Sequence, residues 1–262
     1  MIDLKNKVAV VTGSTSGIGL AMAKGLAAQG CNVMLNGFGD EEKIEQIRAS
    51  MEKDHNVKVS YNSANMAKPE EIRTLIQKTV DTFGGLNILI NNAGIQRVHP
   101  IEDFPEEDWD DIIAINLSSV FHTMKAAVPH MRKADWGRII NTASVHGLVG
   151  SVHKAAYVAA KHGVVGMTKV VALETAQDNI TCNAICPGWV HTELIDEQIK
   201  IRADKLNVSK DEAEKDILRE KQPSMNFVKT EDLANLVLFL CSPAANQMTG
   251  AELPVDGGWT AQ

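Results

Sequence analysis

Short runs of apolar, mostly β-branched residues alternate along the chain with longer segments in which apolar residues recur every three or four positions. The short runs predict buried strands at residues 8–11, 32–35, 57–61, 88–90, 138–141, 180–185 and 253–255. The longer segments predict helices over residues 18–29, 41–53, 70–83, 106–132, 155–176 and 233–240. Repeated strand–helix–strand units with nearly continuous apolar strands are typical of a parallel sheet covered by helices on both faces. We therefore expect an α/β fold, with residues 1–262 forming a single domain.

Residues 193–226 depart from this pattern, because 16 of these 34 residues are charged. Ile195 and Ile199 lie one helical turn apart, and Ala213, Ile217 and Leu218 mark a second weak apolar face. The segment therefore predicts two amphipathic helices. They could form a solvated insertion or a mobile lid, and their position just after Pro187-Gly188 favours the lid.

Composition and charge narrow the possible partners. The chain has 262 residues and a formal net charge of −7, and it contains no block of Lys and Arg, which argues against nucleic acid as a partner. No apolar stretch approaches the length of a membrane span, so we expect a cytoplasmic protein with no membrane contact.

Cys182 and Cys186 form the only close cysteine pair, with no second pair to complete a metal site. We expect reduced, buried thiols and no metal.

A glycine-rich turn follows the first predicted strand and leads directly into a helix. It reads Thr12-Gly13-Ser14-Thr15-Ser16-Gly17-Ile18-Gly19. Glycines allow a tight turn that brings backbone N–H groups close to a diphosphate, and the helix N-terminus adds a partial positive charge. Between the first strand and first helix of an alternating fold, such a turn predicts a dinucleotide-binding site.

The choice between NAD and NADP depends on residues after the second strand. Residues 36–40 read Asn-Gly-Phe-Gly-Asp, so the acid that usually binds the NAD ribose is displaced or absent. Neither this stretch nor residues 14–16 contains a Lys or Arg to balance the extra phosphate of NADP. We therefore expect NAD.

Tyr157 and Lys161 are separated by one helical turn and so lie on the same helix face. A free tyrosine has a pKa of about 10 and is a poor base near neutral pH. A neighbouring lysine and an oxidised nicotinamide ring, both cationic, would lower that pKa. Ser144, at the end of the fifth strand, could donate a hydrogen bond to the reacting oxygen.

These residues carry a resemblance to the short-chain dehydrogenase/reductase family along the whole chain. The matching motifs, in order, are the turn at 12–19, Asn91-Asn92-Ala93-Gly94, Asn116, Ser144, Tyr157 with Lys161, and Pro187-Gly188. The resemblance implies a Rossmann-type, doubly wound parallel sheet of about seven strands. It also implies that Tyr157 is the acid/base, that Ser144 polarises the oxygen, that Lys161 binds the nicotinamide ribose, and that Asn116 holds a water in a proton relay.

The same resemblance implies a set of cofactor contacts. They are Gly13, Thr15, Ser16, Gly17, Ile18, Gly19, Phe38, Asn65, Met66, Asn92, Ala93, Gly94, Tyr157, Lys161, Pro187, Gly188, Val190 and Thr192. The family often has Asp where Ala64-Asn65-Met66 stands, so the adenine contact would rest on Asn65 here. The resemblance further suggests a homotetramer built through the helices at 106–132 and 155–176.

Within this family, the chain resembles enzymes that act on short 3-hydroxy acids with NAD. The resemblance covers residues 36–39, 157–166 and 183–190. It implies that Gln96, His146, Lys154 and Gln198 bind a substrate carboxylate, while Trp189 and Trp259 enclose the methyl end. A buried carboxylate needs a cation and hydrogen-bond donors, and this set offers both. The expected reaction interconverts (R)-3-hydroxybutyrate and acetoacetate.

Two other functions remain open. A 3-oxoacyl-carrier-protein reductase would use NADPH and would need a basic surface for its acidic carrier, which this acidic chain does not suggest. A non-catalytic NAD-binding sensor would have no chemical need for Asn116, Ser144, Tyr157 and Lys161. Both alternatives fit the sequence less well than a hydroxy-acid dehydrogenase.

Overall fold

The computed structural model describes residues 2–261, which form one parallel sheet of seven strands. The strands are β1 (Val8–Val11), β2 (Asn32–Asn36), β3 (Val59–Asn62), β4 (Ile88–Asn91), β5 (Gly137–Thr142), β6 (Ile180–Pro187) and β7 (Glu252–Val255). Their order in the sheet is β3-β2-β1-β4-β5-β6-β7, so the strand order reverses between β1 and β4. This topology confirms the predicted Rossmann-type, doubly wound α/β fold.

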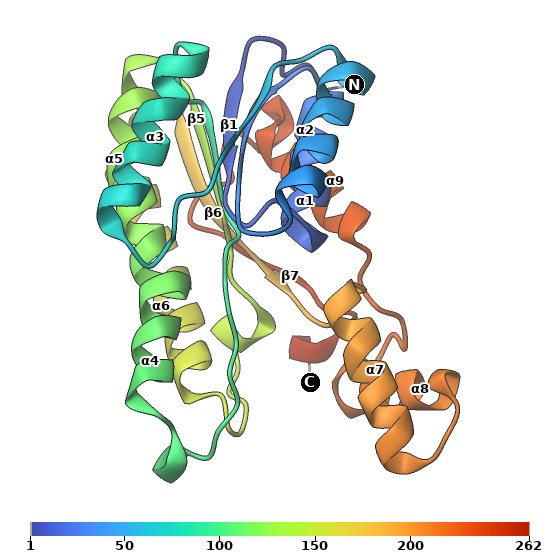
Figure 1. The fold of residues 1–262 in the computed structure, drawn as a ribbon. Helices are drawn as coiled ribbons and strands as arrows, with labels where there is room; N and C mark the ends of the chain where they lie inside the picture. The colour runs from blue at the N-terminus through green and yellow to red at the C-terminus, as the bar shows by residue number, and fades with distance from the viewer. Residues whose placement is uncertain (1, 262) are drawn as a thin grey trace.

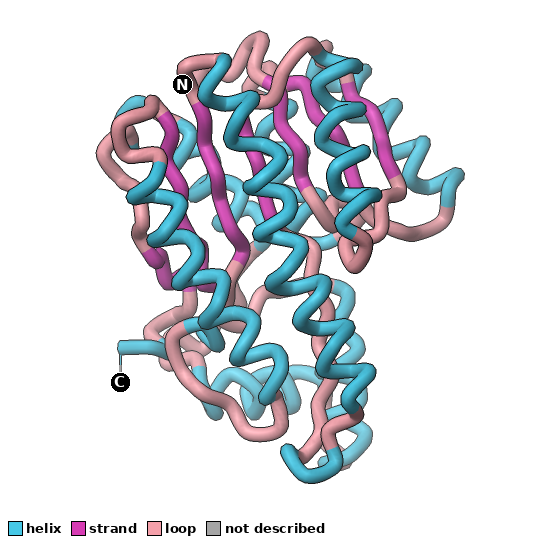
Figure 2. The backbone as a smooth tube through the Cα atoms, turned by 90° about the vertical axis from the view of Figure 1, so that its left-hand side faces the viewer, coloured by secondary structure: helices cyan, strands magenta, loops and turns pink. Residues whose placement is uncertain are grey.

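Helices cover both faces of the sheet (Figures 1 and 2). One layer contains α1 (Gly17–Ala28), α2 (Glu41–His55) and α9 (Thr230–Cys241). The opposite layer contains α3 (Pro69–Phe83), α5 (Ser119–Lys133) and α6 (Ala155–Glu174). All six lie in segments expected to be helical, and the observed ends of all except α5 differ from the predicted ends by at most a few residues.

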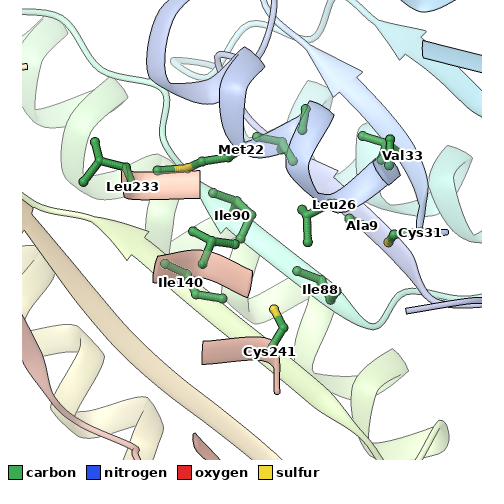
Figure 3. Packing of buried hydrophobic residues seen from close by; sticks show 14 of the residues in the cluster. Ala9, Met22, Leu26, Cys31, Val33, Ile88, Ile90, Ile140, Leu233 and Cys241 are labelled. Carbon is green, nitrogen blue, oxygen red and sulfur yellow. The ribbon is translucent and has the colours of Figure 1, made fainter. Parts of the chain in front are cut away.

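The strands alternate their side chains between two apolar cores, as the period of two in a β-strand requires. In β1, Ala9 and Val11 pack with α1 and α9, whereas Val10 packs with the α3 layer. Figure 3 shows the first core, with Met22 and Leu26 of α1 and Leu233 of α9 over strand residues such as Ile90. The buried strands therefore hold the loops at their carboxyl ends on a rigid base.

The segment predicted as one helix over 106–132 is interrupted in the structure. It consists of α4 (Glu106–Ile113), a π-helical turn (Ala114–Ser118) and α5. The predicted helical segment is confirmed, because residues 106–133 are helical throughout, but apolar periodicity gave no sign of the π-helical turn within it. π-Helical turns occur frequently at functional sites, and Asn116 lies in this one.

The charged segment forms two helices, α7 (Glu193–Leu206) and α8 (Lys210–Lys221), that project past the carboxyl end of the sheet (Figure 1). Asn207 ends α7 in the left-handed conformation, and Ser209 and Glu212 form a capping box at the start of α8. The helices bury a small core of their own: Ile195, Ile199, Ala203, Ala213 and Ile217, with Trp189 and Phe227 against it. The sequence prediction of two amphipathic helices is confirmed.

Two simpler features complete the fold. Within the described residues, no helix combines the length and apolarity needed to cross a lipid bilayer. Cys31, Cys182, Cys186 and Cys241 are all buried free thiols, as the sequence predicted.

Candidate active site

The predicted site residues converge at the carboxyl ends of the strands, beside the point where strand order reverses. A cavity of about 650 Å³ opens there. Its lining includes Asn92 and Gly94 after β4, Ser144 after β5, Tyr157 and Lys161 from α6, Pro187, Gly188, Trp189 and Val190 after β6, and Gln198 from α7. Ligands of open α/β sheets bind at this position, so the cavity is the candidate active site.

The glycine-rich turn has a geometry that only glycine permits at two positions. A Cβ on Gly19 would lie 2.2 Å from the backbone oxygen of Gly13, and a Cβ on Gly13 would lie 2.9 Å from Cα of Ala93. Asn92 ties this turn to β4, because its Nδ2 donates to the backbone oxygens of Thr12 and Gly13 at 3.0 Å. The turn is thus drawn tightly against the loop after β4.

The N-terminus of α1 opens toward solvent-accessible space. Ser16 precedes the helix, and no side chain among the described residues caps it. A second cavity of about 820 Å³ runs past Ser16, Gly17, Ile18, Gly19 and Thr192. Free backbone N–H groups and the helix dipole make this end fit an anionic diphosphate.

A further cavity of about 280 Å³ marks the expected adenosine end. Thr15, Phe38, Asn65, Met66 and Ala93 are among its lining residues, and the described lining includes no Lys or Arg. Asp40 caps α2, because its Oδ1 accepts a hydrogen bond from the backbone N–H of Lys43. Asn36 is buried, and its Nδ2 donates to the backbone oxygens of Asn62 and Ala64.

Tyr157, Lys161 and Ser144 lie together at the base of the active-site cavity. Lys161 is 4% exposed, and its Nζ donates to the backbone oxygen of Thr142 at 2.6 Å. The same Nζ lies 5.6 Å from the centre of the Tyr157 ring. The backbone N–H of His146 donates to Ser144 Oγ at 3.1 Å, which orients that hydroxyl.

Burial shapes the proton affinities of these groups. Burial raises the pKa of Tyr157, while the adjacent Ser144 hydroxyl acts in the opposite direction. Burial lowers the pKa of Lys161 to about 8. An added cation near Tyr157 would favour its phenolate and so oppose the effect of burial.

Asn116 is held by the loop after β4. Its Nδ2 donates to the backbone oxygen of Ile95, and its Oδ1 accepts from the backbone N–H of Ile95, both at 2.8 Å. Its side chain is therefore occupied by the protein itself. The π-helical turn and this double hydrogen bond place Asn116 next to Gly94, since a Cβ on Gly94 would lie 3.4 Å from Asn116 Oδ1.

The residues expected to bind the carboxylate contact the tryptophans and Tyr157 or line the same cavity as Tyr157. Lys154 Nζ lies 5.7 Å from the centre of a Trp189 ring. The His146 ring lies 6.0 Å from the Tyr157 ring and 5.5 Å from that of Trp259, edge-on in both cases. Trp189 and Trp259 are 5.8 Å apart. Gln96 and Gln198 line the cavity, whereas Lys154, His146 and Trp259 are not part of its described lining.

Burial disfavours the protonated forms of Lys154 and His146. Burial lowers the pKa of Lys154. Burial, and then the charge of Lys154, lower the pKa of His146 to about 4, so His146 is neutral near pH 7. A carboxylate beside Lys154 would restore the favourable environment of the ammonium.

The structure also adds residues that sequence patterns did not indicate. Arg97 lines the cavity, and its Nη1 contacts Asp108 Oδ1 at 2.6 Å and Asp111 Oδ2 at 3.1 Å. His99 Nε2 lies 2.9 Å from the other oxygen of Asp108. These contacts link the loop after β4 to α4. The only sequence feature that could have indicated these contacts is the high density of charged residues between positions 97 and 111.

The fold and this constellation define an oxidoreductase that uses a nicotinamide dinucleotide. A family model described as short chain dehydrogenase matches residues 7–202. The chain belongs to the short-chain dehydrogenase family, which confirms the resemblance seen in its motifs.

Individual relatives extend the comparison. The chain is 54% identical over 261 residues to a D-beta-hydroxybutyrate dehydrogenase of Cupriavidus necator, covering 99% of this chain and 100% of the relative. It is 49% identical over 256 residues to the D-beta-hydroxybutyrate dehydrogenase of Rhizobium meliloti, covering 98% and 99%. Among solved structures, L-sorbose reductase of Gluconobacter frateurii, complexed with NADPH and L-sorbose, superposes with a TM-score of 0.94 at 29% identity, covering 99% of this chain and 98% of the other.

Proposed function

We propose that this protein is an NAD-dependent dehydrogenase that interconverts (R)-3-hydroxybutyrate and acetoacetate. The observation that carries the proposal is the placement of Lys154 against Trp189, which lines the cavity, close enough to His146 to lower its pKa and within one helical turn of Tyr157. The D-beta-hydroxybutyrate dehydrogenases identical at 54% and 49% over nearly the whole chain support it.

The cofactor assignment rests on the adenosine end of the site. The diphosphate would lie over Gly13, Gly17 and the N-terminus of α1, and the adenosine between Phe38 and Asn65. The remaining proposed contacts are Thr15, Ser16, Ile18, Gly19, Met66, Asn92, Ala93, Gly94, Tyr157, Lys161, Pro187, Gly188, Val190 and Thr192. NAD fits better than NADP because the described lining of this end contains no cation to balance a 2′-phosphate.

In the proposed mechanism, residues of the chain bind the substrate and orient its reacting carbon. Lys154, His146, Gln96 and Gln198 hold the carboxylate, which orients C3 of the substrate. Tyr157, Lys161 and the residues after β4 and β6 would hold the nicotinamide end of NAD, which would supply the acceptor for the hydride from C3.

Tyr157 takes the hydroxyl proton as the carbonyl forms, so one hydride and one proton leave the alcohol together. Ser144 donates a hydrogen bond to the reacting oxygen, and Lys161 holds the ribose and favours the phenolate. Asn116 would hold a water that carries the proton onward, through hydrogen-bonding groups that its contacts with Ile95 leave available.

The segment 193–226 would act as a lid. Gln198 reaches the cavity from α7, so closure of this helix would exclude water and complete the carboxylate site. Trp189 and Trp259 would enclose the methyl end of the substrate.

A homotetramer is part of the proposal. Phe121 on α5 and Val170 and Leu173 on α6 are exposed apolar side chains on adjacent helices. A groove of about 320 Å³ between these helices includes Phe121, Val128 and Met167. Light scattering after gel filtration would give a mass near four times 28.5 kDa if this face joins copies of the chain.

An absorbance assay for NADH tests the reaction. The purified protein is given (R)- or (S)-3-hydroxybutyrate with NAD or NADP, and 3-oxoacyl thioester with NADPH in a parallel reaction. We expect turnover of the (R) acid with NAD and weak turnover of the thioester. Preference for the thioester with NADPH would identify a 3-oxoacyl reductase instead, and no turnover over a panel of small alcohols would indicate a non-catalytic NAD sensor.

A further inference from the structure

A buried glutamine outside the predicted site holds the wall of the cavity in place. Gln222 directly follows α8 and is 1% exposed. Its Oε1 accepts from the backbone N–H of Trp189 at 2.9 Å, and its Nε2 donates to the backbone oxygen of Asn226. Both ends of the side-chain amide are therefore bound, one of them to a residue that lines the cavity.

Two glycines make room for this side chain. A Cβ on Gly188 would lie 2.7 Å from Gln222 Oε1, and a Cβ on Gly257 would lie 2.8 Å from Gln222 Cγ. Gly188 immediately precedes Trp189, and Gly257 precedes Trp259 by two residues. Gln222 is thus wedged between the two backbone segments that carry these tryptophans.

Backbone hydrogen bonds also join the segment 222–228 to Trp189 and Gly257. The N–H of Ser224 donates to the oxygen of Gly257 at 2.9 Å, and the N–H of Val228 donates to the oxygen of Trp189 at 2.9 Å. Both backbone groups of Trp189 are consequently bound to the segment 222–228. This segment links Trp189 to the turn that carries Trp259, whose ring lies 5.8 Å from that of Trp189.

We propose that Gln222 is a specificity-determining positioning residue, which sets the spacing of Trp189 and Trp259 and so limits the acid to a small group at C4. The proposal rests on the proposed function for its substrate. It also limits the proposed lid to residues 193–221, because residues 222 and 224 are hydrogen-bonded to Trp189 and Gly257, which follow β6 and β7.

The physical argument concerns size discrimination. A hydrophobic wall distinguishes substrates that differ by one methylene by about 10-fold or more, provided that the wall keeps its position. A wall whose backbone anchor is lost can shift outward. The longer acid then gains relative to the shorter one, whereas the general loss of a structural residue would weaken both equally.

The test compares Gln222→Met with Gln222→Glu. Methionine has a similar length but neither hydrogen bond, whereas glutamate keeps an acceptor for the N–H of Trp189. Gln77→Met, on the exposed face of α3, is the matched control. Unfolding temperatures establish that each variant is folded, and NADH fluorescence gives its cofactor affinity.

The decisive measurement is the ratio of kcat/KM for (R)-3-hydroxybutyrate to that for (R)-3-hydroxypentanoate. We expect Gln222→Met to lower this ratio by about 5-fold or more, mainly through KM of the shorter acid, with NADH affinity unchanged. Gln222→Glu should recover most of the ratio. An equal loss for both acids would overturn the proposal.

A second measurement does not depend on turnover. Acrylamide quenching of tryptophan fluorescence is compared in Gln222→Met with and without the additional change Trp189→Phe. Increased quenching that disappears with Trp189 supports the positioning role, and unchanged quenching overturns it. If the unaltered protein oxidises neither acid, the proposed function fails, and quenching alone decides the role of Gln222.

Discussion

The ammonium of Lys154 lies 5.7 Å from the centre of a ring of Trp189. A cation over an indole face gains electrostatic attraction, and the indole also shields it from bulk water. Burial lowers the pKa of this lysine, so an anionic ligand would relieve an unfavourable environment. Under the proposed function, this pair would therefore bind a small carboxylate more favourably than a neutral alcohol.

Replacing Lys154 should weaken binding of the substrate without changing the affinity for the cofactor. We expect Lys154→Met to raise KM for (R)-3-hydroxybutyrate by roughly 10- to 100-fold, since a hydrogen bond to a charged group contributes about 1.5–3 kcal/mol. NADH affinity should stay within twofold. Steady-state kinetics with both substrates varied would measure this, with the exposed Lys78→Met on α3 as the control. An unchanged KM for the acid would remove Lys154 from the carboxylate site.

Removing the phenolic oxygen should stop the chemistry without preventing binding. Tyr157→Phe keeps the ring beside His146 and Lys161 but has no group to accept the proton. We expect kcat to fall by about 10²–10⁴-fold, while fluorescence titration shows NADH bound as before. Retention of more than a few per cent of the activity would argue against Tyr157 as the acid/base.

The glycine turn should not tolerate even one methyl group. In Gly19→Ala the new Cβ would lie 2.2 Å from the backbone oxygen of Gly13, so the turn must shift. We expect NADH affinity to fall at least about 10-fold, which corresponds to about 1.4 kcal/mol. Gly85→Ala is the matched control, because no described atom lies within 4 Å of its added Cβ. Equal NADH affinity in the two variants would contradict the placement of the diphosphate.

His146 should make stability depend on pH. Its pKa is lowered from 6.5 to about 4 in the folded protein, first by burial and then by Lys154. The unfolded chain therefore binds a proton at a higher pH than the folded chain does. The stabilisation is complete above about pH 6.5 and is lost as the pH falls toward 4, by up to about 3 kcal/mol.

Denaturant unfolding at several pH values tests this dependence. Other groups also titrate in this range, so the informative quantity is the difference between the unaltered protein and His146→Gln. We expect the free energy of unfolding of the unaltered protein to fall more steeply between pH 6.5 and 4. Parallel curves for the two proteins would show that His146 titrates normally.

Local sequence determines the fold class and the outline of the site. The apolar periodicities predict the strands and helices, and the turn from Thr12 to Gly19 predicts a dinucleotide-binding site. Tyr157 and Lys161 share a helix face because they are four residues apart. Such features depend on neighbours in the chain, so the sequence alone contains them.

Tertiary structure decided what depends on residues far apart in the chain. Asn116, in the π-helical turn, is hydrogen-bonded to the backbone of Ile95, 21 residues earlier in the chain. Gln222 contacts Trp189 across 33 residues and fits only because Gly188 and Gly257 leave space for it. These arrangements depend on long-range packing, and a hydrophobic pattern does not predict which residues far apart in the sequence will be in contact.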